Sequence, residues 1–140
     1  MSRGLLRVVV AVLAINALAG GSLCLVLGLK GLSVLGIKLS VEPNDLSFGP
    51  VDYVFRALAG VWFGLGLMLG WLVFCLERQT TWFRFACLAM FLMGVGRLLS
   101  VLALGVGSNP MVAMVLELVV PPLLLVWQGK VAKTAVACVR

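Results

Sequence analysis

The sequence contains no histidine and very few acidic residues. Its 140 residues include 5 acidic and 11 basic side chains, which gives a formal net charge of +6. The absence of histidine largely excludes haem ligation, typical zinc catalysis and histidine acid–base chemistry. The four cysteines form no CxxC pair, so no redox motif or thiolate metal site is indicated. We therefore expect neither a metal nor a cofactor.

Known catalytic motifs are also missing. The sequence has no glycine-rich phosphate loop and no GxSxG, HExxH or paired-carboxylate motif. Its basic residues lie at the ends of apolar runs, without interleaved aromatic residues along one stripe. This pattern predicts membrane lipids as partners and no nucleic acid, and it favours a protein that is not an enzyme.

Apolar residues dominate what is present. Hydrophobic residues make up 63% of the chain and charged residues 11%, with a mean hydropathy of +1.19. Soluble proteins have about half apolar and a quarter charged residues. The composition therefore predicts an all-α integral membrane protein, with residues 1–140 forming one domain and no room for a separate soluble catalytic domain.

Four apolar runs are long enough to cross a bilayer, for which about 20 residues suffice. Length selects helices, because open strands would leave backbone groups unpaired in lipid. We predict four transmembrane helices in an up-down bundle, with an outer-side loop at about 30–55; the helices are 8–29, 57–76, 85–106 and 111–128.

The first run also resembles a signal peptide. Arg3 and Arg7 form a basic start, and Ala17-Leu18-Ala19 resembles a cleavage site. The apolar run continues to residue 29, ten residues beyond Ala19, and is longer than the apolar h-region of an ordinary signal peptide. We therefore expect the first helix to be retained.

Lysine and arginine are distributed unevenly between the connections. The N-terminus, the 77–84 connection and the tail together carry seven, whereas 30–56 carries three and the 107–110 turn none. Positive residues concentrate on the cytoplasmic side. The count predicts that both termini lie in the cytoplasm.

Arg97 and Glu117 are ionisable residues inside predicted spans. Such residues are costly in lipid and are candidates for function. The two spans are antiparallel neighbours, and from the rise of a helix the two side chains lie at depths that differ by about 5 Å, within reach of an arginine. We expect a direct or water-bridged contact that binds a lipid headgroup or small ligand, or forms a proton path. The alternative is a buried ion pair that only fixes helix register.

Four further polar or kinking residues accompany this pair. Pro121 cannot donate to the carbonyl of Glu117, nor Pro122 to that of Leu118, so we predict a kink and two freed carbonyls. Asn16 and Arg56 could complete a polar interior, although an interhelical hydrogen bond and an interface anchor are their simpler interpretations. Small residues at spacings of three or four, as at Gly60 and Gly64, predict tight helix packing, within one chain or between two.

Several stretches resemble a known family: RALAGVWFGLGLMLGW from Arg56, FLMGVGRLLSVLALG from Phe91, the SNP turn and LELVVPPLLLVWQ. Over about 55–130 they are similar to small four-helix bacterial membrane proteins known as domain of unknown function 4345. The resemblance implies an inner-membrane protein in which Arg56, Arg97, Glu117 and Pro121 are characteristic positions. It brings no assigned activity.

The function expected from the sequence is therefore that of a non-enzymatic bacterial inner-membrane protein with an Arg97–Glu117 polar cluster. A homo-oligomer or another membrane protein as partner is left open. The alternatives are a small oligomeric proton-coupled transporter and, with less support, an enzyme acting on lipid or quinone.

Overall fold

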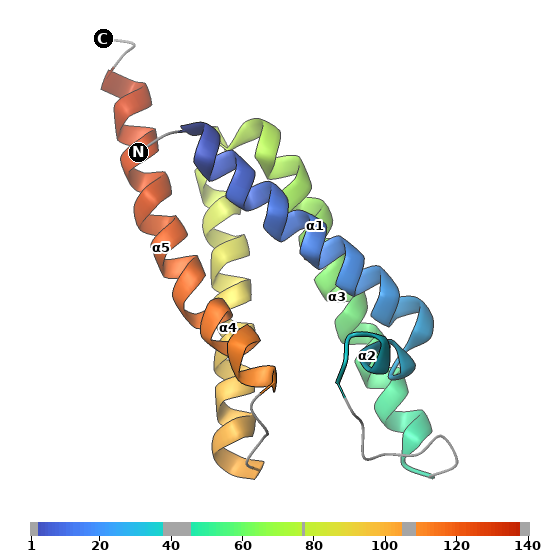
Figure 1. Cartoon of the computed structure of the whole chain (residues 1–140). Helices are drawn as coiled ribbons and strands as arrows, with labels where there is room; N and C mark the ends of the chain where they lie inside the picture. The colour runs from blue at the N-terminus through green and yellow to red at the C-terminus, as the bar shows by residue number, and fades with distance from the viewer. Residues whose placement is uncertain (1–2, 38–45, 77, 105–108, 138–140) are drawn as a thin grey trace. The chain divides into compact units, whose positions relative to one another are not determined.

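The computed structural model describes residues 3–37, 46–76, 78–104 and 109–137, and these ranges contain five α-helices and no strand (Figure 1). The helices are α1 (Arg3–Leu27), α2 (Lys30–Val34), α3 (Phe48–Cys75), α4 (Thr80–Leu104) and α5 (Asn109–Ala137). All but α2 are long and apolar enough to cross a membrane. The all-α class is confirmed, while the up-down order of one bundle stays a prediction.

The third helix begins well before the predicted boundary, at Phe48 rather than at 57. The predicted 30–55 loop therefore contains α2 and the first turns of α3. Asp52 and Arg56 are therefore one turn apart on α3 and form an ion pair there. Pro50 is tolerated because the N–H groups of a first turn have no acceptor within the helix.

The chain divides into two compact units. Unit 1 comprises residues 1–10 and 71–140, and unit 2 comprises residues 11–70. Unit 1 therefore contains α4 and α5 with the first turns of α1, and unit 2 contains α2 with most of α1 and α3. Each unit is built around one antiparallel helix pair.

In unit 2, α1 and α3 approach so closely that glycine is required at the contacts. A Cβ added at Gly21 would lie 2.8 Å from the backbone nitrogen of Phe63, and one at Gly66 would lie 2.8 Å from that of Leu18. Real side chains do not tolerate such distances to a backbone atom. These small residues therefore pack helices within one chain, which settles at these positions a question that the sequence left open.

In unit 1, α4 and α5 pack along their length. Buried residues recur every three or four positions along α5, as expected for one face of a helix. Its buried residues are Met114, Glu117, Pro121, Leu124, Gln128 and Val131. The helix continues through Pro121 and Pro122 as one element. The hydrogen bonds that the two prolines cannot donate therefore do not end the helix.

Candidate functional site

Arg97 and Glu117 meet between α4 and α5 of unit 1. The Nε atom of Arg97 lies 3.1 Å from Oε2 of Glu117. Arg97 comes from the last turns of α4 and Glu117 from the third turn of α5, so the short turn between the helices places them at a similar depth. The structure thus brings together the two residues that the sequence pairs.

The two partners differ strongly in exposure. The side chain of Glu117 is 9% exposed and that of Arg97 is 44% exposed. Oε2 of Glu117 is buried and has no hydrogen-bond partner, so the contact is an ion pair without hydrogen-bond alignment. In the described part of the chain the guanidinium makes no other polar contact, although it carries five N–H donors. Most of its hydrogen-bonding capacity is available.

Gly94 allows this pair to form. A Cβ added at Gly94 would lie 3.0 Å from Cβ of Glu117 and 3.1 Å from its carbonyl carbon. Gly94 precedes Arg97 by three residues and therefore lies on the same side of α4. Because Gly94 has no side chain, the backbone of α4 can approach Glu117 closely, and this close approach lets the side chain of Arg97 contact the carboxylate.

Arg56 occupies a different polar site, in unit 2. Its Nε donates to Oδ2 of Asp52 at 2.7 Å, and its Nη1 donates to the carbonyls of Leu25 and Val26 at 3.0 and 2.7 Å. These carbonyls belong to the last turn of α1, where no acceptor is satisfied within the helix. Arg56 therefore caps the C-terminal end of α1.

Asp52 and Gly28 complete the cap. Oδ1 of Asp52 accepts the backbone N–H of Leu29 at 2.7 Å. Gly28 has φ +61°, the left-handed conformation that commonly ends a helix, and a Cβ there would overlap Asp52. The sequence interpretation missed Asp52 because it began the helix at 57; the spacing of four residues between Asp52 and Arg56 could have revealed the pair.

Asn16 lies on α1 in unit 2, where its side chain is exposed. Among the described residues it makes no hydrogen bond. Its membership in a polar cluster with Arg97 and Glu117 stays a prediction, as does that of Arg56, whose described contacts are all with α1 and α3 of its own unit.

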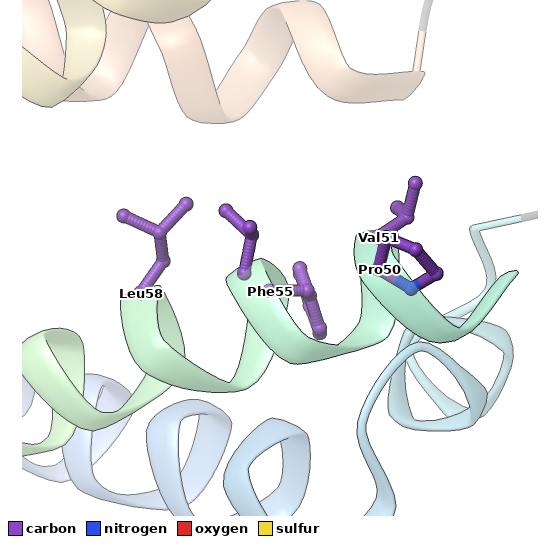
Figure 2. Close-up of a pocket in the computed structure, with 5 residues that line it drawn as sticks. Pro50, Val51, Phe55 and Leu58 are labelled. Atoms are coloured by element: carbon purple, nitrogen blue, oxygen red, sulfur yellow. The ribbon is translucent and has the colours of Figure 1, made fainter. Parts of the chain in front are cut away.

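Two hollows accompany these sites. A groove of about 510 Å³ in unit 1 is lined by Val9 of α1 and by one side of α5 from Val120 to Lys130. The other, of about 470 Å³, lies along α3 and is lined by apolar residues between Pro50 and Leu58. Figure 2 shows Val51 and Leu58 projecting from one face of α3 into this hollow. No polar side chain lines the α3 hollow, whereas Lys130 is among the residues that line the groove.

Thiols and acids are dispersed. Cys24, Cys75 and Cys87 are free. In the described ranges no three histidine, cysteine or acidic side chains come together in a way that could hold a metal ion.

The fold and the polar pair define a class: small all-helical proteins with four helices long enough to cross a membrane. The family model described as "Domain of unknown function (DUF4345)" matches residues 5–128, and the chain belongs to this family. No curated protein and no solved structure matched the chain. The family of the sequence resemblance is confirmed, and its function is unknown.

Proposed function

We propose that this chain is a multi-pass, non-enzymatic protein of the bacterial inner membrane with both termini in the cytoplasm. Four apolar helices of sufficient length support the membrane assignment. The distribution of seven against three lysines and arginines supports the orientation. Appending a reporter enzyme to each connection would test it: a periplasm-active reporter should work after residue 40 and fail after residue 79.

The Arg97–Glu117 pair is the site that we propose for binding a lipid headgroup or a small ligand with acceptor oxygens. One observation carries this: the side chain of Arg97 is 44% exposed beside the side chain of Glu117, which is 9% exposed. In a hydrocarbon environment each unsatisfied donor costs several kcal/mol. Arg97 precedes the end of α4 by seven residues, about 10 Å of helix, and with both termini in the cytoplasm as proposed, this supports a position in the outer half of the span.

The chemistry of the pair selects the kind of ligand. The arginine and glutamate together carry no net charge, so hydrogen bonds to the guanidinium must do most of the binding. A phosphate or carboxylate can accept two parallel N–H bonds from one guanidinium. A headgroup phosphate or a small carboxylate therefore fits the exposed edge of Arg97 better than an uncharged apolar molecule.

Exchanging the two charges separates binding from a purely structural role. We expect Arg97→Ala and Glu117→Ala each to lower the folded yield, and Arg97→Glu with Glu117→Arg to restore it. The exchanged protein has its carboxylate on the exposed side, so native mass spectrometry should find the co-purified ligand lost although folding is restored. Retention of the same ligand by the exchanged protein would reject the binding proposal and leave a pair that fixes register.

A proton-coupled transporter is the second candidate. Glu117 supports it, because Oε2 is buried and makes no hydrogen bond that would hold it in one protonation state. For this function Glu117→Gln should abolish proton-driven uptake into vesicles while expression stays unchanged. Uptake that survives this substitution would exclude the transporter mechanism based on Glu117.

A further inference from the structure

The end of α5 remote from Glu117 carries unsatisfied donors beside the groove in unit 1. Trp127 lines the groove, and its indole Nε1 is buried without an acceptor. The next residue, Gln128, also has a buried Nε2 without a partner, but it does not line the groove. Buried donors without an acceptor are uncommon in folded proteins. The unpaired indole N–H of Trp127 at an open groove indicates that a group with acceptor oxygens belongs there.

The groove is lined mostly by apolar side chains and by one basic residue. Val9 of α1 and the aliphatic residues of α5, Leu124 among them, line it together with Lys130. Lys130 is also at the end of the apolar span Met111–Val131, the depth at which a bilayer changes from hydrocarbon to headgroups. One groove therefore offers an apolar channel of about 510 Å³ next to a cation at headgroup depth.

The charge around this end favours an anion. The N-terminus, the 77–84 connection and the tail together hold seven lysines and arginines and one acid, Glu77. Glu117 precedes Lys130 by thirteen residues on α5, about 20 Å away along the helix. This site is therefore separate from the Arg97–Glu117 pair and does not depend on the function proposed for that pair.

We propose that the groove binds an anionic phospholipid. One acyl chain lies along Val9 and Leu124, and the phosphate lies near the Lys130 ammonium. The ester or phosphate oxygens accept from the Trp127 indole N–H. An anionic lipid is favoured over a free anion because most of the groove is apolar. It is favoured over a neutral lipid because the polar groups of the groove are a hydrogen-bond donor and a cation.

The test is a titration of delipidated full-length protein with phosphatidylglycerol and with phosphatidylcholine, read by native mass spectrometry. Wild-type protein should bind phosphatidylglycerol more tightly. Lys130→Gln should weaken phosphatidylglycerol binding about fivefold, as expected for one lysine near a membrane surface, and leave phosphatidylcholine unchanged. Arg84→Gln is the matched control, because this exposed arginine carries the same charge but does not line the groove.

A second pair of variants tests the walls. Val9→Phe should fill the groove and weaken both lipids, whereas Val8→Phe, at an exposed neighbour that does not line the groove, should weaken neither. Repeating the titration with Arg97→Gln excludes lipid held at that residue. Equal loss of phosphatidylglycerol binding from Lys130→Gln and Arg84→Gln would overturn the proposal and indicate general surface charge instead. A Val9→Phe protein that folds and binds both lipids normally would also overturn it.

Discussion

The two units each contain an arginine–carboxylate pair, and the two pairs are satisfied in opposite ways. Arg56 of unit 2 makes three hydrogen bonds, one to Asp52 on the same helix and two to carbonyls of α1, and Asp52 also accepts the backbone N–H of Leu29. Among the described residues, Arg97 of unit 1 makes one polar contact, to Glu117, at 3.1 Å and without hydrogen-bond geometry. The exposed fractions of the two arginines are close, at 42% and 44%. The number of hydrogen bonds that the guanidinium makes, more than the exposed fraction of the side chain, distinguishes an arginine that stabilises the fold from one that is available to a ligand.

Gly28→Ala should have the largest effect on the comparison, because it disrupts the satisfied pair. Alanine in a left-handed conformation costs about 1–2 kcal/mol, and displacement of Asp52 adds the loss of its hydrogen bonds. We expect the free energy of unfolding in detergent to fall by about 2–4 kcal/mol. Gly36→Ala is the control, since Gly36 has φ +79° and open space around it. Equal losses at the two positions would show that the Asp52 contact contributes nothing.

Neutralising the two acids should give unequal results. Asp52→Asn weakens the charge-assisted hydrogen bonds that Asp52 accepts from Arg56 and from the backbone N–H of Leu29, so a clear loss of stability is expected. Glu117→Gln removes no hydrogen bond and should change stability by less than about 1 kcal/mol. Thermal unfolding of both variants in the same detergent measures the difference. A larger loss at Glu117 would reverse the assignment of roles.

Replacing each arginine by lysine should sharpen the contrast. Lysine has no planar fork and cannot serve Asp52 and two carbonyls in the geometry of Arg56, so Arg56→Lys should cost about 1 kcal/mol. Arg97→Lys keeps a charge near Glu117 and should cost less than about 0.5 kcal/mol. Its ligand retention should nevertheless fall, because the bidentate contact is lost. If stability and retention fall together at Arg97, the two arginines have the same structural role.

A small effect of the opposite sign is expected at the glycines of α4. Gly96→Ala meets open space and should stabilise the helix by about 0.5–1 kcal/mol through helix propensity. At Gly94 the new methyl group would press on Glu117, so the gain should be cancelled and the pair moved apart. Unfolding midpoints of the two variants provide the comparison, and an equal gain at Gly94 would mean that α5 yields without cost.

The sequence predicts the Arg97–Glu117 pair, whereas it does not reveal the partners of Arg56. Arg97 and Glu117 stand out because each interrupts an apolar run, and a short turn between antiparallel helices fixes their relative depth. The partners of Arg56 depend on a backbone feature, the left-handed Gly28, and on where α3 begins. Hydropathy does not report either. The same limit explains the glycines, since only the structure shows that Gly21 contacts Phe63 of the same chain.

The cap on α1 also has a consequence for the order of synthesis. The carbonyls of Leu25 and Val26 receive their donors from a residue 30 or 31 positions later in the chain. While α1 leaves the ribosome its end remains open, and it closes only when the first turns of α3 have been made. We expect α1 and α3 to enter the membrane as one hairpin: a chain arrested after residue 50 should be extracted by alkaline carbonate, whereas a chain arrested after residue 79 should resist extraction.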